Sequence, residues 1–325
     1  MMPDDPVVLI WDPIRDLEWS YERERELLAA QGVRLVVPET DRATVEQLGG
    51  ADVLIVSDPF PSELLVHLTR CAGIICYSVG MDAVDAAAAA AAHLPVTNVA
   101  GYCTDEVSDH AMALLLAVER RLIPFTRSAD RGEWDVYSGA DFYGIRRMRG
   151  QTVGIVGLGR IGSQTAVKCA AFGMSVIAYD PFLTRSPLDF VELTELDALL
   201  ERSDVIVLCS ALTESSRRLL DADRIAAMRP GVVIVNVARG ALIDEAALVD
   251  ALASGQVSGA ALDVRAQEPP DVNGDPLRGM PNVVLTQHMA ATSTEARDDL
   301  HVFAARRATE LLADAGRVPA RTESR

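Results

Sequence analysis

The stretch Thr152–Asp180, TVGIVGLGRIGSQTAVKCAAFGMSVIAYD, decides the fold of this 325-residue chain. It begins with the apolar, β-branched run Thr152–Val156, which predicts a strand, and continues into the pattern G-x-G-x-x-G. Apolar residues at helical spacing follow in Arg160–Phe172, and Met174–Tyr179 predicts a second strand that ends at Asp180. Strand, glycine loop, helix, strand and acid in this order are typical of a site that binds a dinucleotide.

Each glycine of the pattern has its own task in such a loop. Gly157 allows a tight turn, Gly159 lets a pyrophosphate approach the backbone, and Gly162 lets the helix pack on the strand. The pyrophosphate would lie at the helix N-terminus, where the helix dipole favours an anion. A carboxylate at Asp180 accepts hydrogen bonds from a ribose diol and repels a 2′-phosphate, so the sequence predicts NAD(H) over NADP(H). The alternative is a glycine turn in some other α/β protein.

Composition excludes several classes of function. The net charge of −17 at pH 7 argues against nucleic acid and against an anionic membrane surface as partners. The five cysteines lack the spacing of metal ligands, so we expect no metal site and reduced thiols in the core. We find no apolar run long enough to span a membrane and no secretory signal in MMPDDPVVLIWD. These features predict a cytoplasmic enzyme.

Strand and helix patterns alternate over most of the chain. Residues 1–100 contain short apolar runs separated by helical patterns, and the same alternation resumes after the glycine loop. Two longer helical patterns cover Thr104–Arg121 and Glu295–Ala313. The predicted fold class is α/β, with two doubly wound parallel sheets of the Rossmann-like kind. Because residues 1–100 lack a glycine fingerprint, we expect only the second block to bind a dinucleotide.

Three stretches that follow predicted strands carry groups able to do chemistry. They are NVARG at 236–240, DVRAQEP at 263–269 and TQHMA at 286–290. Because the carboxyl ends of parallel strands meet at one edge, we expect Arg239, Glu268 and His288 to lie there. An arginine fork can hold a carboxylate, a histidine can pass a proton near neutrality, and a carboxylate beside it favours its charged form. Each residue also has an ordinary structural explanation, as a surface cation, a solvated acid or a core histidine.

The chain resembles the D-isomer-specific 2-hydroxyacid dehydrogenases over nearly its whole length. The resemblance rests on SVGMDAVD (78–85), VTNVAGYCTDEVSDHAMALLL (96–116), RGEW (131–134), RGQTVGIVGLGRIG (149–162), NVARGALIDEAAL (236–248), ALDV (261–264) with EP (268–269), and TQHMA (286–290). The separation of Arg239 and Glu268, 268 − 239 = 29 residues, also matches the family pattern. The tract YCTDEVSDH is similar to the branch of C-terminal-binding-protein-like and phosphoglycerate-dehydrogenase-like members.

The resemblance implies two α/β domains with an active-site cleft between them. The substrate domain would comprise residues 1–101 and 291–325, and the NAD-binding Rossmann domain residues 102–290. The two longer helices would connect the domains as hinges, and closure would exclude water around the hydride. Members of the family are usually dimers through the cofactor domain, so the resemblance implies a homodimer.

The resemblance also implies a role for each site residue. Arg239 would bind the substrate carboxylate, His288 would donate a proton to the carbonyl oxygen, and Glu268 would keep His288 protonated. Backbone N–H groups of Val79 and Gly80 would hold the same carboxylate. The implied cofactor contacts are Thr104, Gly157, Gly159, Arg160, Ile161, Gly162, Asp180, Ser210, Ala238, Arg239 and Asp263.

Position at predicted strand ends supplies candidates for the substrate lining. They are Asp58, Phe60, Tyr77, Tyr102 and Met289, none of which is basic. A phosphorylated substrate would need additional Lys or Arg, for which Arg15 on the first loop is a candidate beside its ordinary explanation as a surface cation. We therefore expect an unphosphorylated 2-keto acid.

The function predicted from these residues is the interconversion of a 2-keto acid and a D-2-hydroxy acid with NAD(H). One alternative is an NADH-responsive binding protein of the corepressor type, in which catalysis is incidental. Another alternative is a dehydrogenase of a phosphonate or phosphite substrate. All three start from the same dinucleotide site and differ in what lies beside it.

Overall fold

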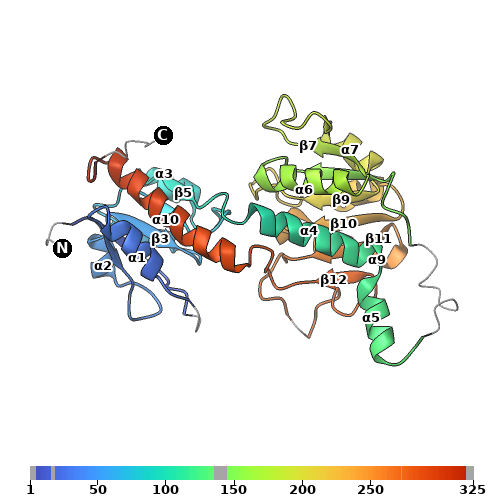
Figure 1. The fold of residues 1–325 in the computed structure, drawn as a ribbon, viewed down its shortest axis with the longest axis horizontal. Helices are drawn as coiled ribbons and strands as arrows, with labels where there is room; N and C mark the ends of the chain where they lie inside the picture. The colour runs from blue at the N-terminus through green and yellow to red at the C-terminus, as the bar shows by residue number, and fades with distance from the viewer. Residues whose placement is uncertain (1–4, 16–18, 135–144, 272, 320–325) are drawn as a thin grey trace. The chain divides into compact units, whose positions relative to one another are not determined.

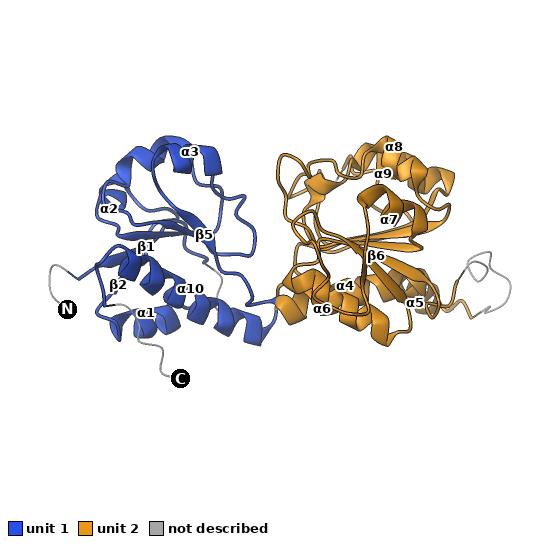
Figure 2. Cartoon of the chain, turned by 90° about the horizontal axis from the view of Figure 1, so that it is seen from above, with its two compact units in different colours: residues 1–103, 293–325 blue, residues 104–292 orange. Residues whose placement is uncertain are grey.

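The computed structural model describes residues 5–15, 19–134, 145–271 and 273–319 of the chain. The chain divides into two compact units, unit 1 from residues 1–103 and 293–325 and unit 2 from residues 104–292 (Figure 2). Each unit is built around one sheet in which all strands run parallel (Figure 1). The predicted fold class, two parallel-sheet α/β units, is confirmed.

Unit 1 is a three-layer α/β unit. Its sheet has the order β2-β1-β3-β4-β5 and consists of β1 (Val7–Ile10), β2 (Arg34–Val36), β3 (Val53–Val56), β4 (Ile74–Cys76) and β5 (Val96–Asn98). Figure 2 shows α2 (Val45–Gly49) and α3 (Ala86–Ala91) on one face, and α1 (Glu22–Ala29) and α10 (Thr294–Asp314) on the other. Val8 and Ile10 enter the core under α1 and α10, while Leu9 and Trp11 enter the opposite core. This burial on both faces explains why β1 is apolar throughout.

Unit 2 is also three-layered, with a larger sheet. The order β12-β11-β10-β9-β6-β7-β8 comprises β6 (Thr152–Val156), β7 (Ser175–Tyr179), β8 (Glu192–Leu193), β9 (Val205–Leu208), β10 (Val232–Asn236), β11 (Val257–Leu262) and β12 (Val283–Leu285). Helices α4 (Thr104–Glu119) and α6 (Arg160–Ala171) cover one face, and α7 (Leu196–Arg202), α8 (Ala222–Ala227) and α9 (Glu245–Ser254) the other (Figure 2). The strand order reverses between β6 and β9, which is where doubly wound sheets bind ligands.

The helix expected over Thr104–Arg121 is shorter than predicted. Helix α4 ends at Glu119, Arg121 adopts a left-handed conformation with φ 49°, and α5 (Leu122–Asp130) begins at the next residue. Pro124 explains the break, because its ring has no N–H for the carbonyl four residues earlier. In the first turn of α5 that N–H is not needed, so the proline is tolerated there.

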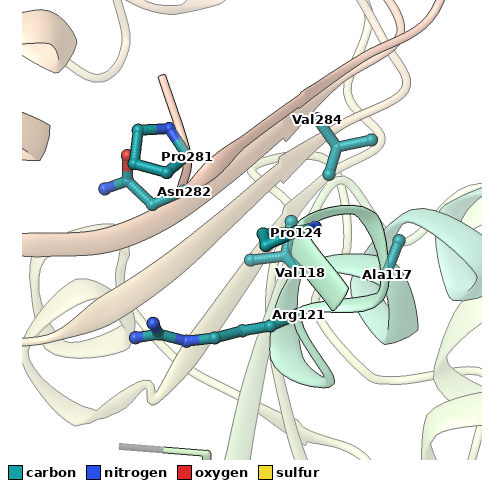
Figure 3. Close-up of a pocket in the computed structure, with 7 residues that line it drawn as sticks. All are labelled: Ala117, Val118, Arg121, Pro124, Pro281, Asn282 and Val284. Atoms are coloured by element: carbon teal, nitrogen blue, oxygen red, sulfur yellow. The ribbon is translucent and has the colours of Figure 1, made fainter. Parts of the chain in front are cut away.

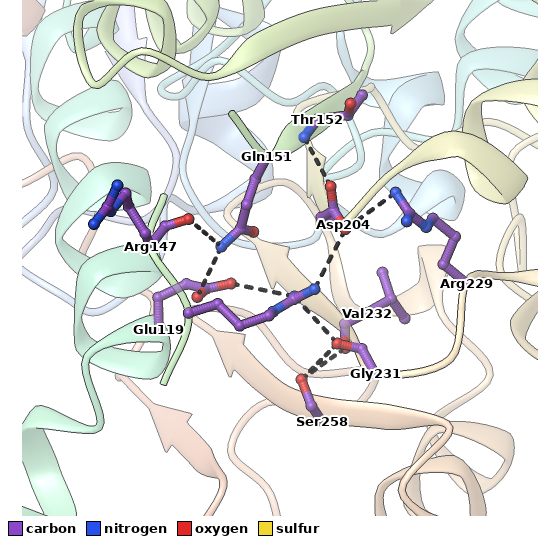
Figure 4. Close-up of polar contacts among 10 residues, drawn as sticks. Glu119, Arg147, Gln151, Thr152, Asp204, Arg229, Gly231, Val232 and Ser258 are labelled. Carbon is purple, nitrogen blue, oxygen red and sulfur yellow. Dashed lines mark hydrogen bonds and ion pairs between the residues drawn. The ribbon is translucent and has the colours of Figure 1, made fainter. Parts of the chain in front are cut away.

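A network of polar side chains lies at the amino-terminal edge of the unit 2 sheet (Figure 4). Asp204, just before β9, accepts the backbone N–H of Thr152 at 2.9 Å and pairs with Arg229 at 3.1 Å and Arg146 at 3.3 Å. Glu119 at the end of α4 lies 3.8 Å from Arg146, and only 3% of its side chain is exposed. These groups lie at the start of the strands, so the opposite, carboxyl-terminal edge is the one left for a ligand.

Among the residues that the structure describes, no helix combines the length and the apolar character that a membrane span requires.

Replacing Glu119 should change how stability depends on pH. Burial raises the pKa of Glu119 above its usual value, with Arg146 opposing the shift. A carboxyl whose folded pKa is raised ionises at a cost in the native state, so its unfavourable contribution appears as pH rises from the unfolded pKa through the folded pKa. Glu119→Gln should therefore gain free energy of unfolding relative to wild type across this window, by about 1.4 kcal/mol for each unit of pKa shift.

The measurement is urea unfolding of both proteins between pH 4 and pH 8. Glu192→Gln is the matched control, because its exposed carboxylate pairs with Arg202 and its pKa is lowered. That variant should show no gain with rising pH. If the difference in free energy of unfolding between Glu119→Gln and wild type stays constant from pH 4 to pH 8, burial does not raise the pKa of Glu119.

Candidate functional site

The predicted site residues of unit 2 line up along the carboxyl-terminal edge of its sheet. Because all strands are parallel, the segments that follow them lie on one edge in the strand order β7, β6, β9, β10, β11, β12. Along this edge come Asp180, the glycine loop, Ser210, Ala238 with Arg239, Asp263, and His288. The predicted dinucleotide residues thus run along the edge from Asp180 to Asp263, and the residues predicted to bind and reduce a substrate lie at its β10–β12 end.

The glycine loop has the close approaches that the pattern predicts. Gly157 has φ 91°, and a Cβ there would lie 2.7 Å from the Cα of Ser210 on the neighbouring strand end. A Cβ on Gly162 would lie 1.9 Å from the carbonyl oxygen of Gly157. A Cβ on Gly159 would meet no atom of the described residues within 4 Å, so the second glycine has room beside it. No side chain caps the N-terminus of α6, where Arg160 and Ile161 begin the helix, so the loop fits an anionic pyrophosphate.

Asp180 lies beside this loop and supports it. One carboxylate oxygen accepts the N–H of Leu158 at 2.9 Å, and the other accepts the N–H of Phe182 at 3.0 Å. A carboxylate oxygen accepts up to two hydrogen bonds, so each retains capacity for a ribose hydroxyl. The hydroxyl of Ser210 is buried and makes no hydrogen bond within the described part of the chain. Both observations fit a bound ribose-containing group that would complete these hydrogen bonds.

The loop after β10 holds Arg239 through Asn236. The Asn236 side chain is fully buried; it accepts the N–H of Ala238 at 3.0 Å and donates to the carbonyl of Arg239 at 2.9 Å. One guanidinium nitrogen of Arg239 donates to the carbonyl of Ala238 at 2.8 Å. The half-buried arginine is thereby oriented by its own loop, and a guanidinium has enough N–H groups to form a carboxylate fork as well.

The structure brings Glu268 and His288 together, as predicted. Nδ1 of His288 lies 2.6 Å from Oε2 of Glu268, and Oε1 of Glu268 accepts the N–H of Arg265 at 2.7 Å. The His288 side chain is 49% exposed. Because Nδ1 faces the carboxylate, Nε2 is the ring nitrogen left to exchange a proton with a ligand.

Asp263 fixes the loop that carries His288. Its side chain is 1% exposed and accepts the N–H groups of Met289 at 3.0 Å and Ala290 at 2.9 Å. Its own carbonyl accepts the N–H of His288 at 2.7 Å, and His110 of α4 lies 3.4 Å from its carboxylate. His288 has φ 54°, a conformation that costs about 1–2 kcal/mol for a residue with a Cβ. These hydrogen bonds hold it there; the expected contact of Asp263 with a cofactor stays a prediction.

In unit 1, the turn after β4 presents two backbone N–H groups. The carbonyl of Ser78 accepts the N–H of Val99 at 3.1 Å, that of Val79 accepts the Asn98 side chain, and that of Gly80 accepts the Ser78 hydroxyl at 2.9 Å. The N–H groups of Val79 and Gly80 have no partner among the described residues. Two adjacent free donors of this kind form a concavity that suits a small anion.

The other expected residues fall into two groups. Phe60 and Tyr77, expected in the substrate lining, are each 5% exposed and belong to the cores of unit 1. Asp58 and Met289 are exposed and Tyr102 is half-buried, so these three keep a surface that a ligand can meet. Thr104 is the first residue of α4 and is half-buried.

Sequence reasoning missed several residues that position the site. Asn98 and Asn236 hold the two loops predicted to bind a carboxylate, and Arg265 donates its N–H to Glu268. Asn236 ends the apolar, buried strand β10, and a polar amide in that position is a signal that could have identified it, whereas Asn98 ends the half-buried strand β5 and has no such signal. Arg265 had no such signal, because its partners are far away in the sequence.

In the described ranges, no group of three or more His, Cys, Asp or Glu side chains is placed to hold a metal ion. A small cavity of about 60 Å³ lies elsewhere in unit 2, between the end of α4, the start of α5 and β12 (Figure 3). It is lined by Val118, Pro124 and Pro281 among others and contains none of the predicted site residues.

Residues 112–290 match the family model described as the NAD-binding domain of D-isomer specific 2-hydroxyacid dehydrogenases. The chain is 36% identical over 262 residues to glycerate dehydrogenase of Methylorubrum extorquens, covering 79% of this chain and 81% of that protein. It is also 36% identical over 308 residues to D-3-phosphoglycerate dehydrogenase of Mycobacterium tuberculosis, covering 90% of this chain but only 54% of that longer protein.

A solved structure shows the same likeness over the whole chain. It is the NADPH-dependent glyoxylate/hydroxypyruvate reductase of Sinorhizobium meliloti in complex with NADP and malonate, which is 30% identical with a TM-score of 0.81. The comparison covers 98% of this chain and 97% of that one.

Alanine substitutions at Gly162 and Gly159 should have different effects, one on the stability of the fold and the other on NADH binding. Gly162→Ala should lower the melting temperature, because its Cβ would overlap the Gly157 carbonyl. Gly159→Ala has room for its Cβ and should keep the wild-type melting temperature, but should bind NADH roughly tenfold more weakly, a loss of about 1.4 kcal/mol.

Thermal melting and fluorescence titration with NADH check both variants. Gly49→Ala in unit 1, where the nearest atom to the new Cβ is 3.9 Å away, should change neither quantity. Wild-type NADH affinity in Gly159→Ala would contradict the assignment of this loop to the pyrophosphate.

Proposed function

Because the chain belongs to the D-isomer-specific 2-hydroxyacid dehydrogenase family, we propose that Arg239, Glu268 and His288 carry its reaction. The family fixes the class of activity: an NAD(P)-dependent oxidoreductase that acts on the CH–OH group of a 2-hydroxy acid or on the corresponding 2-keto acid. The observation that supports the residue roles is the 2.6 Å contact between His288 and Glu268 at the carboxyl edge of the sheet.

His288 is the proposed acid and base. The carboxylate of Glu268 beside Nδ1 favours the charged imidazolium, so Nε2–H can protonate the substrate carbonyl oxygen during reduction. In the oxidative direction, neutral His288 removes the hydroxyl proton through the same nitrogen. When bound, the nicotinamide supplies the hydride for reduction and accepts it in oxidation.

Arg239 is the proposed anchor of the substrate carboxylate. Its planar fork can donate two parallel hydrogen bonds to the two carboxylate oxygens, which aligns the neighbouring carbonyl for reaction. The N–H groups of Val79 and Gly80 in unit 1, which have no partner among the described residues, support their proposed role as donors to a carboxylate. Both sets of donors bind an anion without needing a metal ion.

We also propose that NAD(H) is preferred over NADP(H). Asp180 is held by the N–H groups of Leu158 and Phe182, so its charge is fixed next to the glycine loop. A carboxylate there accepts hydrogen bonds from a ribose diol and opposes a 2′-phosphate.

For the substrate, we propose a small, unphosphorylated 2-keto acid. Relatives named glycerate dehydrogenase and glyoxylate reductase act on small acids of this class. Arg15, the one candidate for a phosphate contact, already donates to the carbonyls of Pro38 at 2.9 Å and Thr40 at 2.7 Å. NADH oxidation should be assayed against glyoxylate, hydroxypyruvate, pyruvate, branched 2-keto acids, phenylpyruvate and phosphonopyruvate. Activity with phosphonopyruvate alone would contradict this proposal.

The two alternatives from the sequence gain no support from these findings. The relatives from M. extorquens, M. tuberculosis and S. meliloti are two dehydrogenases and a reductase, not corepressors or phosphite enzymes. Arg239, Glu268 and His288 are all present, and the last two form the expected pair.

A homodimer in the cytoplasm completes the proposal. No residue of α5 is buried, and Leu122, Phe125 and the nearby Trp134 are 49%, 40% and 76% exposed. We infer that a second copy covers this apolar surface. Light scattering should then give twice the 34.9 kDa of one chain.

The five free cysteines support a reducing compartment, and a native disulfide in the purified protein would contradict it.

Removing the proposed acid and the proposed anchor should abolish most turnover. His288→Gln should lower kcat for reduction by roughly 10²–10⁴-fold, because proton transfer is lost, while NADH affinity stays at the wild-type value. Arg239→Lys should also lose most activity, because an ammonium cannot form the planar fork. Steady-state kinetics and NADH titration measure both effects.

The control is His93→Asn, which replaces an exposed histidine of unit 1 that also has a positive φ of 56°. Its kinetics should be unchanged. If His288→Gln retains wild-type turnover, the proton donor is a different group.

Removing the Asp180 carboxylate should relax the cofactor preference. Asp180→Ala should weaken NADH binding and reduce the ratio of kcat/KM for NADH over NADPH by about tenfold, equal to about 1.4 kcal/mol. Asp189→Ala, which removes an exposed acid from the same segment, should leave the ratio at its wild-type value. An unchanged ratio in Asp180→Ala would rule out the contact with the ribose.

A further inference from the structure

We infer that Arg265 is a positioning residue: its side chain, bound between Glu245 and Asp275, fixes the loop whose backbone N–H directs Glu268 toward His288. The inference rests on the proposed roles of Glu268 and His288. It concerns how these two residues are held, and assigns Arg265 no contact with substrate or cofactor.

The guanidinium of Arg265 forms two forks with two carboxylates. Nε and Nη2 donate to Glu245 at 3.1 Å each, and Nη1 and Nη2 donate to Asp275 at 2.6 Å and 2.9 Å. The Arg265 side chain is 9% exposed and that of Asp275 is 5% exposed. The arginine beside it lowers the pKa of Asp275, so both partners stay charged at neutral pH. A guanidinium satisfies two such forks only in one plane, which fixes its orientation.

The same contacts fix the backbone that holds Glu268. Glu245, in the first turn of α9, accepts the N–H of Ala266 at 2.7 Å as well as the Arg265 side chain. Arg265 donates its own N–H to Oε1 of Glu268 at 2.7 Å, which leaves Oε2 facing Nδ1 of His288 at 2.6 Å. The distance between the carboxylate and the imidazole therefore depends on where the Arg265 backbone lies.

The loop of Arg239 packs on this same backbone. A Cβ on Gly240 would lie 1.9 Å from the carbonyl carbon of Arg265 and 2.2 Å from the nitrogen of Ala266. Only a glycine allows such an approach. The segment fixed by Arg265 thus touches the loop of the proposed carboxylate anchor on one side and holds the partner of the proposed acid on the other.

Ion pairs that are largely buried, as these are, are weak evidence for a purely stabilising role. Well-packed apolar side chains often give equal or greater stability than a buried ion pair. The charged cluster instead restricts the loop to one backbone conformation, because four hydrogen bonds hold the Arg265 side chain in place. That difference can be measured, since loss of stability and loss of positioning affect different quantities.

The test is Arg265→Met, which removes all four side-chain hydrogen bonds and keeps an unbranched apolar stem in place of the arginine methylenes. We expect kcat for 2-keto acid reduction to fall by roughly tenfold while the Kd for NADH stays the same. The basic limb of the kcat/KM profile should move to lower pH, because a carboxylate that is no longer held against His288 stabilises the imidazolium less. A structural role alone would lower the melting temperature and leave the pH profile of the folded enzyme unchanged.

Arg202→Met is the matched control for the loss of a fork. Arg202 also forms two hydrogen bonds to one carboxylate, that of Glu192, at 2.7 Å and 2.8 Å, on the exposed surface of the same unit. Its replacement should leave kcat and the pH profile at their wild-type values. A shift of the same size in Arg202→Met would overturn the inference.

A double-mutant cycle with Glu268→Gln decides whether Arg265 acts through Glu268. If it does, Arg265→Met should add little to the loss already caused by Glu268→Gln. Equal losses in both backgrounds would overturn the inference. A wild-type pH profile in Glu268→Gln itself would overturn the proposed role of Glu268, whereas a shifted profile there with none in Arg265→Met would overturn only the inference about Arg265.

A neutral triple variant covers the case in which Arg265→Met fails to fold. Arg265→Met alone leaves two carboxylates without their cation, whereas Arg265→Met combined with Glu245→Gln and Asp275→Asn leaves no unpaired charge. This variant should fold and still show the shifted pH profile. A folded triple variant with the wild-type profile and kcat would overturn the inference.

Discussion

The buried carboxylate of Asp263 is the interaction on which the arrangement of the site depends. It receives the N–H groups of the two residues after His288, and the Asp263 carbonyl receives that of His288 itself. These bonds help to offset the cost of a left-handed backbone at His288, a residue with a Cβ. Because Asp263 follows β11, whose residues are mostly buried, the sheet sets where this carboxylate lies and thereby places the histidine.

The two edges of the unit 2 sheet have different roles: ion pairs lie at the amino edge, and the proposed ligand site lies at the carboxyl edge. At the amino edge, Asp204 and its arginines pair charge with charge around the first residues of the strands. At the carboxyl edge, the buried hydroxyl of Ser210 makes no hydrogen bond in the described part of the chain. A buried hydroxyl without a protein partner fits a position where a bound ligand completes the hydrogen bond.

The sequence predicted the fold and the ends of the strands better than the links between loops. The glycine loop, Asp180 and the pairing of Glu268 with His288 follow from short motifs, because adjacent parallel strands must end at one edge. The break before α5 was missed because a left-handed residue such as Arg121 has no signature of its own. Asn236 was missed although its partners Ala238 and Arg239 lie only two and three residues away. The role of the Arg265 side chain depends on Glu245 and Asp275, which only tertiary packing brings beside it, so no local pattern could reveal it. Burial of Phe60 and Tyr77 likewise follows from tertiary packing.

The strand order has a consequence for how such a protein can change over evolution. Asp180 follows β7 and His288 follows β12, and β6, β9, β10 and β11 lie between them in the sheet. Substitutions that alter the choice of dinucleotide are thus separated by four strands from those that alter proton transfer, and distant substitutions tend to act independently. A lineage could change its cofactor from NAD(H) to NADP(H) without disturbing proton transfer at the active site. It could equally accept new substrates while it keeps the same cofactor.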